Sequence, residues 1–194
     1  DLGRAGCGAG EFSSCVRQTV YVFPESRDFL PGPFSHAPEI IRLFSELIAP
    51  FPYEKLAHLQ SSTRYGGMEN AGAIFYADAP FRRRTMRAGV IAHETAHQWF
   101  GDAVTEREWS HVWLSEGFAT YFEQLWIERF QGDSAFRASM QGLRDQIVKA
   151  PEVASRPVID TAQTDLMALL NTNSYQKGGW TLHMLRSLVG DSAF

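Results

Sequence analysis

Apolar side chains recur along this chain with two different spacings, which predict strands first and helices after them. Residues 16–23 (VRQTVYVF) are rich in β-branched and aromatic side chains and end before Pro24, which indicates a strand that closes in a turn. Residues 58–63 and 71–76 predict two more short strands around a glycine-rich stretch at 64–70. We therefore expect a small sheet in the first half of the chain.

Helical spacing of apolar positions covers most of the remaining sequence. One helix is expected before Pro50, with Ser35 as a possible cap, and another between Thr85, which can cap it, and Gly101, which can end it. Strands followed by helices favour an α+β fold. The predicted helices cover residues 38–49, 85–100, 111–130, 134–149 and 174–189, and the predicted loops or turns cover 24–35, 77–80 and 151–165. Residues 103–109 predict a strand or an extended connection.

Composition limits the class of protein. The chain has 194 residues, of which 44% are hydrophobic and 21% charged, as expected for one globular domain. A formal charge of -4 gives no basic surface for nucleic acid, and no run of 18 apolar residues predicts a membrane span. Cys7 and Cys15 are too few for a disulfide framework or a thiolate zinc site, and whether they pair with each other stays open.

The segment HETAHQWF at residues 93–100 carries the first candidate chemistry. His93 and His97 are four residues apart on a predicted helix, so both imidazoles project from one face and can bind a single ion. Glu94 can then reach a water molecule on that ion and serve as a general base. Two unrelated histidines remain an alternative interpretation of this spacing on its own.

A second helix supplies a candidate third ligand. Glu116, in WLSEGFATYFE, follows His97 after eighteen residues, which leaves room for a return to the site. Three protein ligands leave a fourth position for water, as a catalytic zinc requires. Glu123 lies seven residues further on the same helix face and is placed to hydrogen-bond a ligand histidine, although an exposed helix carboxylate is an equal alternative.

Together with GGMEN at 66–70 and SYQKGG at 174–179, these motifs resemble the M1 family of zinc aminopeptidases, the gluzincins related to thermolysin. The resemblance implies a thermolysin-like catalytic domain over residues 16–194, with a small mixed sheet followed by helices that carry one zinc ion. It also implies that this domain lacks its final helices here, at its C-terminal side. Residues 1–15 would be the end of an upstream β domain or a linker, and further domains would flank the chain.

The same resemblance implies roles that spacing alone does not give. Glu69 would bind the α-amino group of a peptide with a free N-terminus, and the strand around it would offer backbone groups to the extended substrate. Tyr175 would donate its hydroxyl to the oxyanion of the tetrahedral intermediate. Without the resemblance, GGMEN is a turn with a surface glutamate and Tyr175 a packing residue. The substrate-binding stretch would comprise Gly66, Gly67, Met68, Glu69 and Asn70.

Two positions depart from the commoner family pattern. Gly67 stands where most members have alanine, and Ser115 stands where many have asparagine. An epoxide-hydrolysing branch of the family also carries GGMEN, so Gly67 widens the range of substrate subclasses. Two alternatives stay open, an endopeptidase of the thermolysin type and a catalytically silent scaffold of the same fold.

Overall fold

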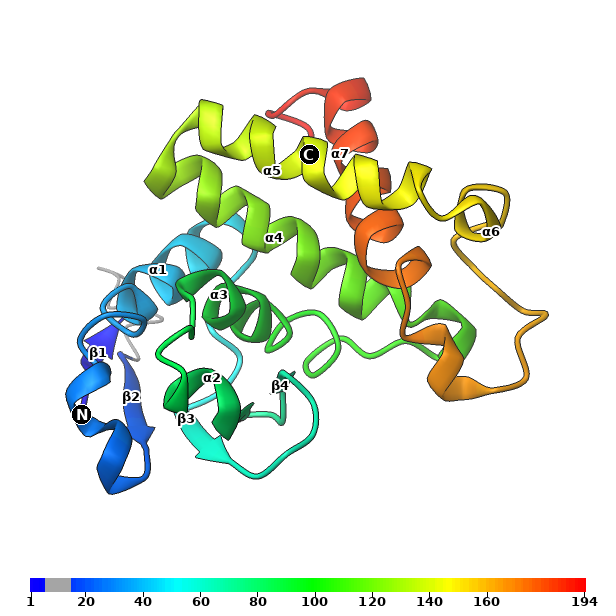
Figure 1. The fold of residues 1–194 in the computed structure, drawn as a ribbon. Coiled ribbons are helices and arrows are strands. Elements are labelled where there is room, and N and C mark those ends of the chain that lie inside the picture. The colour runs from blue at the N-terminus through cyan, green and yellow to red at the C-terminus, as the bar shows by residue number, and fades with distance from the viewer. Residues whose placement is uncertain (6–14) are drawn as a thin grey trace. The chain divides into compact units, whose positions relative to one another are not determined.

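The chain divides into two compact units. The computed structural model describes residues 1–5 and 15–194 (Figure 1). The first unit is Asp1–Ala103 and contains the described strands, and the second is Val104–Phe194 and is helical. The predicted α+β class, with a small mixed sheet followed by helices, is therefore confirmed.

A mixed five-stranded sheet forms the base of the first unit, with the strand order β1-β2-β3-β5-β4. The two outer strands, β1 and β4, run antiparallel to their neighbours, whereas β2, β3 and β5 are parallel. The strands span Gly3–Ala5 (β1), Val16–Tyr21 (β2), Lys55–Ser61 (β3), Gly67–Met68 (β4) and Ala73–Ala77 (β5). The stretch at 64–70 thus contains a two-residue edge strand, which the residue pattern alone did not predict and the family resemblance implied.

Parallel pairing of β2 and β3 requires a crossover, which α1 provides. In this unit α1 packs against α3, and the ring of Phe44 in α1 meets that of Trp99, in the turn after α3, edge to face at 6.2 Å. The indole Nε1 of Trp99 also donates a hydrogen bond to the carbonyl of Ala49 at 3.0 Å. The helical segments of this unit are η1 (Pro24–Phe29), α1 (Ala37–Leu47), α2 (Asp78–Arg82) and α3 (Ala88–Ala96).

One histidine lies in the core of the sheet. His58 in β3 is fully buried, and its Nδ1 is 2.9 Å from the hydroxyl of Tyr76 in β5. Gln18 Oε1 in β2 lies 3.5 Å from the other ring nitrogen. Burial lowers the pKa of His58 to about 3, because a charged imidazole would lose its hydration here. His58 is therefore neutral in the folded chain at neutral pH.

Several element boundaries in the first unit differ from the sequence prediction. The segment expected as a loop at 24–35 begins with the 3-10 helix η1, for which Pro24 supplies a suitable φ, and α2 replaces the expected turn at 77–80. Helix α3 is shorter than the predicted 85–100, and Thr85 does not cap it, because the helix begins only at Ala88 with Arg87 at the N-cap position. Ser35 likewise bonds to the Gly32 carbonyl and caps no helix.

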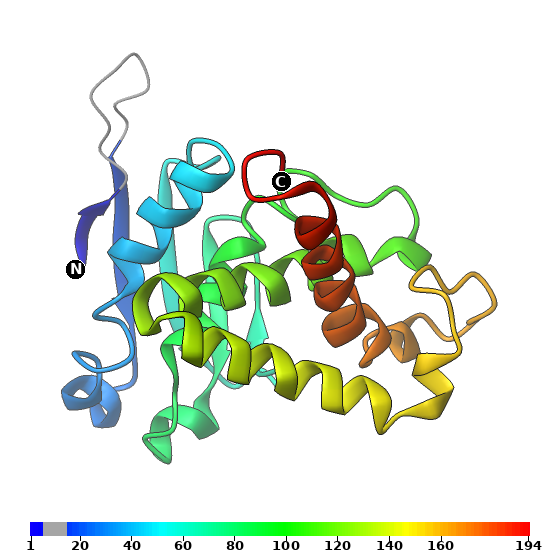
Figure 2. The same ribbon diagram turned by 90° about the horizontal axis from the view of Figure 1, so that it is seen from above.

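The second unit is built around the hairpin of α4 and α5. The two helices meet at Gly132, whose φ of 89° ends α4 where the sequence predicted, and α7 packs against α4 (Figures 1 and 2). Buried Tyr121, Phe136, Met140, Leu143 and Leu182 form their common core. The segments are η2 (Trp109–His111), α4 (Trp113–Gln131), α5 (Asp133–Val148), α6 (Pro151–Ala154), η3 (Leu166–Leu169), η4 (Asn173–Lys177) and α7 (Gly178–Val189).

Two predictions in the second unit need correction. The expected loop at 151–165 begins with the short helix α6, for which Pro151 takes a first-turn position. The expected helix at 174–189 begins as the π-helical segment η4 and becomes α-helical only at Gly178. None of the helices described here has the length and hydropathy that crossing a bilayer would require.

One of the two cysteines lies among the described residues. Cys15 is disulfide-bonded. Cys7 lies outside the described residues, so its pairing with Cys15 stays an open prediction.

Two glycines bring α4 and α7 into backbone contact. A Cβ placed on Gly117 would lie 2.9 Å from the backbone of Gly178, and one on Gly178 would lie 3.0 Å from the Cα of Gly117. Neither glycine has a positive φ, so the close approach of the helices, and not backbone conformation, requires glycine here. This contact fixes the position of the segment that precedes α7.

We expect Gly178→Ala to lower the free energy of unfolding by about 1–3 kcal/mol, because the added methyl group forces α4 and α7 apart. Gly142→Ala is the matched control, since a Cβ at this position in α5 meets nothing within 4 Å. The control should raise stability by up to about 1 kcal/mol through helix propensity. Chemical denaturation of both variants measures the difference, and equal effects would contradict the contact.

His58 should make stability depend on pH. The pKa of His58 in the folded chain, about 3, lies below the value near 6.5 of an unfolded chain. Between these values the unfolded state binds a proton that the folded state does not, so stability falls as the pH is lowered from 6.5 towards 3. The expected slope from this residue is about 1.4 kcal/mol per pH unit.

Denaturation of metal-free wild type and His58→Gln over this range checks the slope. Glutamine can still bond to the Tyr76 hydroxyl, and the other titrating groups are common to both proteins. The wild type should therefore lose stability more steeply on acidification than the variant. Parallel curves would show that His58 makes no such contribution.

Candidate active site

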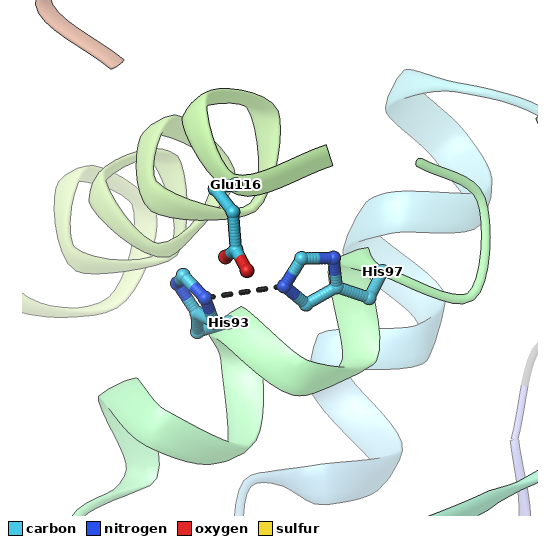
Figure 3. Close-up of side chains that lie close together, drawn as sticks. All are labelled: His93, His97 and Glu116. Atoms are coloured by element: carbon cyan, nitrogen blue, oxygen red, sulfur yellow. Dashed lines mark hydrogen bonds between the residues drawn. The ribbon is translucent and has the colours of Figure 1, made fainter. Parts of the chain in front are cut away.

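His93 and His97 lie on one side of α3 and its C-terminal turn, one helical turn apart (Figure 3). Their Nε2 atoms are 3.2 Å apart, and the two rings meet edge to face at an interplanar angle of 75°. The third residue drawn in Figure 3, Glu116, belongs to α4 in the second unit. The histidine pair thus has the helical spacing that the sequence predicted.

The geometry of the histidine pair fits a shared metal ion. The Nδ1 of His97 is 3.0 Å from the Phe100 carbonyl oxygen, an acceptor that fixes the proton on Nδ1 and leaves the Nε2 lone pair for a ligand. Two nitrogens bound to one tetrahedral zinc at about 2.0–2.1 Å would lie about 3.3 Å from each other. The separation between His93 and His97 therefore suits a single zinc ion.

Glu94 lies on the same helix and is buried to 6% exposure. Carboxylate oxygens of Glu69 and Glu94 and a ring nitrogen of His97 all lie within 4.8 Å of one another. The stretch that carries Glu69 and the helix that carries Glu94 thus place two acidic groups beside a candidate ligand. An arrangement of this kind can hold a cation or an amine next to a proton acceptor.

Gln98 ties the edge of the sheet to the helix, and sequence reasoning missed it. Its side chain is fully buried, and its Nε2 donates to the Glu69 carbonyl and to Asp102 Oδ2, both at 2.9 Å. Its Oε1 accepts a hydrogen bond from the Gly72 amide at 2.7 Å. A glutamine directly after a candidate metal ligand was the one signal available. Gln98 positions Glu69 relative to α3.

Asp102 is a second residue that the sequence did not single out. Burial raises the pKa of its carboxyl to about 7, and the negative charge of Glu69 adds to this effect while His97 opposes it. Its backbone N–H bonds to the His97 carbonyl at 3.1 Å. The acidic group therefore belongs to the surroundings of the histidine pair.

The second unit holds the other two residues of the predicted chemistry. Glu116 lies buried in the first turn of α4, and the hydroxyl of Tyr175 donates a hydrogen bond to its Oε1 at 2.8 Å. The preceding residue, Ser115, is anchored in turn by a 2.5 Å bond from its Oγ to Glu106 Oε2. Residues 59 positions apart in sequence thus meet within this unit.

Three side chains of the π-helical segment η4 hold Tyr175 in place. Ser174 Oγ donates to the Leu169 carbonyl at 2.6 Å, and Asn173 Nδ2 donates to the Pro157 carbonyl at 2.8 Å. Lys177 Nζ donates to the Val153 carbonyl at 2.8 Å and also bonds to the carbonyl of Arg156. Single π turns recur at functional sites in helices, and this one sets the direction of the tyrosine.

The remaining candidate residues lie as follows. Gly67 and Met68 form β4, Gly66 precedes it and accepts the Ala77 N–H at its carbonyl, and Asn70 accepts the N–H of Ala73. Glu123 is half-buried in α4, and its role beside a ligand histidine stays a prediction.

A mixed sheet with a helix that carries H-E-x-x-H defines the catalytic domain of a metallopeptidase. The family model described as "Peptidase family M1 domain" matches residues 34–194. The chain therefore belongs to peptidase family M1.

Named relatives agree with this assignment. The chain is 28% identical to human endoplasmic reticulum aminopeptidase 2, over 96% of this chain and 21% of that protein. It is 30% identical to aminopeptidase N of Haemonchus contortus, over 94% of this chain and 20% of that protein. The crystal structure of an M1 zinc metallopeptidase from Deinococcus radiodurans superposes with a TM-score of 0.78 at 30% identity, over 98% of this chain and 40% of that one. The chain thus spans about a fifth of the length of these curated relatives.

Proposed function

We propose that this chain is the catalytic part of a zinc aminopeptidase, which hydrolyses the N-terminal peptide bond of peptides. The observation that carries the proposal is the His93 and His97 pair, whose Nε2 atoms lie 3.2 Å apart beside the buried carboxylate of Glu94. Relatives named aminopeptidases and a zinc metallopeptidase support the same activity.

His93, His97 and Glu116 are the proposed ligands of one zinc ion. Spacing supports the histidine pair, and the orientation of His97 by the Phe100 carbonyl supports it further. Glu116 is supported by its distance in sequence from His97 and by the hydroxyl of Tyr175, which orients its carboxylate. Glu123, on the same helix, is the proposed hydrogen-bond partner of a ligand histidine. Zinc bound here would lower the pKa of a water molecule to about 7 and polarise the scissile carbonyl.

Two side chains of the protein would handle protons and charge. Glu94 takes a proton from the attacking water and later passes it to the leaving amine, which requires an ionised carboxylate beside the metal ligands. The Tyr175 hydroxyl donates a hydrogen bond to the substrate carbonyl oxygen as negative charge develops on it. The hydrogen bond that this hydroxyl donates to the Glu116 carboxyl group supports its role as a donor.

Selection of a free N-terminus is assigned to Glu69. A fixed carboxylate near the metal can bind an α-amino group and so place the first peptide bond at the metal. The Gln98 side chain holds the backbone of Glu69, and Asn70 ends the stretch that begins at Gly66. The edge strand β4 would supply backbone groups to the extended peptide.

The domain division from the sequence is retained as part of the proposal. Residues 16–194 would form the catalytic domain, and residues 1–15 would belong to an upstream β domain or a linker. In the structure β1 pairs with β2, so residues 3–5 add a strand to the sheet of the proposed catalytic domain. Flanking domains would complete the substrate pocket.

We expect the full-length protein to release the N-terminal residue from a peptide with a free amine and to leave its N-acetylated copy intact, because acetylation removes the charge that Glu69 binds. A chelator should abolish this activity and zinc should restore it. Cleavage of both peptides would instead indicate a thermolysin-type endopeptidase. Cleavage of neither, with zinc bound, would indicate a silent scaffold.

Glu94→Gln should lower kcat by roughly 10²- to 10⁴-fold while zinc stays bound, because the amide keeps the shape of the side chain but accepts no proton. Glu46→Gln makes the same change on an exposed face of α1 and should leave kcat unaltered. Steady-state kinetics and metal analysis of the two variants make the comparison. Wild-type turnover by Glu94→Gln would remove the proposed base.

A further inference from the structure

The ammonium group of Lys177, in the SYQKGG motif, bonds to three backbone carbonyls. Its Nζ donates to the Val153 carbonyl at 2.8 Å and to the Ala154 carbonyl at 3.3 Å, and it also bonds to the carbonyl of Arg156. Val153 and Ala154 end the short helix α6, and a lysine can supply the hydrogen bonds that carbonyls at a helix end need. Lys177 therefore ties η4 to the end of α6.

Asn173 bonds to the next stretch of the same segment. Its side chain is buried, and its Nδ2 donates to the Pro157 carbonyl at 2.8 Å. Asn173 lies two residues before Tyr175, and Lys177 lies two residues after it. Side chains on either side of the tyrosine thus hold one continuous segment, residues 153–158, which we call the strap.

Tyr175 lies in the middle of η4, and Lys177 also closes this π-helical turn. The backbone N–H of Lys177 bonds to the Thr172 carbonyl at 3.0 Å, while its side chain holds the strap. The hydroxyl of Tyr175 is the far end of its ring, so a small rotation of the turn becomes a larger displacement at the hydroxyl. The 2.8 Å bond from this hydroxyl to Glu116 Oε1 therefore depends on how firmly η4 is held.

We propose that Lys177 is a positioning residue, which holds η4 against the strap and so keeps the Tyr175 hydroxyl where the substrate carbonyl oxygen develops its charge. The proposal rests on the proposed role of Tyr175 as the oxyanion donor. A displacement of about 1 Å in such a group can cost on the order of 10²-fold in rate.

Lys177→Met, made in the full-length protein, keeps the length of the side chain and removes the ammonium group. Ala154 and Arg156 are exposed, so water can bond to their carbonyls in the variant. The variant should lower kcat by on the order of 10²-fold and leave KM and bound zinc near the wild-type values, because the peptide and the metal are held by other residues. Lys149→Met is the matched control at an exposed position after α5 and should leave kcat unaltered. A rise in KM at constant kcat would overturn the proposal.

Tyr175→Phe tests whether the effect of Lys177 acts through the tyrosine. Alone it should lower kcat by roughly 10²- to 10³-fold, as for a lost oxyanion donor. Adding Lys177→Met should then lower kcat by less than about twofold more, because no hydroxyl is left to misplace. Asn173→Ala, which releases the other end of the strap, is the second variant and should show the same dependence. An equal loss in both backgrounds, or an unchanged kcat in Lys177→Met, would overturn the proposal.

Crystal structures of metal-free wild type and Lys177→Met decide the positioning without any activity. The distance between the Tyr175 hydroxyl and Glu116 Oε1, 2.8 Å in the wild type, should increase by about 1 Å or more in the variant. A hydroxyl that keeps its place would contradict the proposal. If the wild type has no peptidase activity, or if Tyr175→Phe keeps the wild-type kcat, the proposed function or its tyrosine fails, and this comparison still decides whether Lys177 positions the hydroxyl.

Discussion

Two imidazoles that begin one helical turn apart must reach the same point in space, and much of the first unit is arranged around this constraint. The backbone of α3 sets the spacing of His93 and His97, and the Phe100 carbonyl orients the second ring. The sheet edge must then approach the same helix closely enough for Glu69 to share the site. Gln98 holds the sheet edge against α3, because its buried side-chain amide bonds both to the backbone of Glu69 and Gly72 and to Asp102.

In the second unit, close backbone packing and a π turn place the hydroxyl of Tyr175 beside Glu116. The hydroxyl of Tyr175 reaches Glu116 although the helices α5, α6 and η3 lie between their two elements in sequence. The contact between Gly117 and Gly178 removes the side chains that would hold α4 and α7 apart, and the π turn before α7 directs the ring. Backbone packing of α4 against α7 and the side-chain hydrogen bonds of η4 together determine where the hydroxyl lies.

The sequence predicted the parts of this chain that depend on local pattern. The helices around residues 37–47, 113–131 and 133–148 follow from apolar spacing and from stop signals such as Gly132, and the histidine pair follows from helical periodicity. What depends on tertiary contact was missed. No local pattern shows that Gln98 bonds to the sheet edge, because its partners Gly72 and Glu69 lie 26 and 29 positions away. The roles of Glu69 and Tyr175 came from family resemblance, since neither residue has a spacing that implies chemistry.

The shortness of β4 has a consequence for how this protein meets other chains. An edge strand exposes unpaired amides and carbonyls, which can recruit a strand from any neighbouring molecule and start aggregation. With two residues in its ladder, β4 presents a template too short for such open-ended pairing. An edge of this length can pair with a short extended segment without offering the long flat ladder on which neighbouring chains associate.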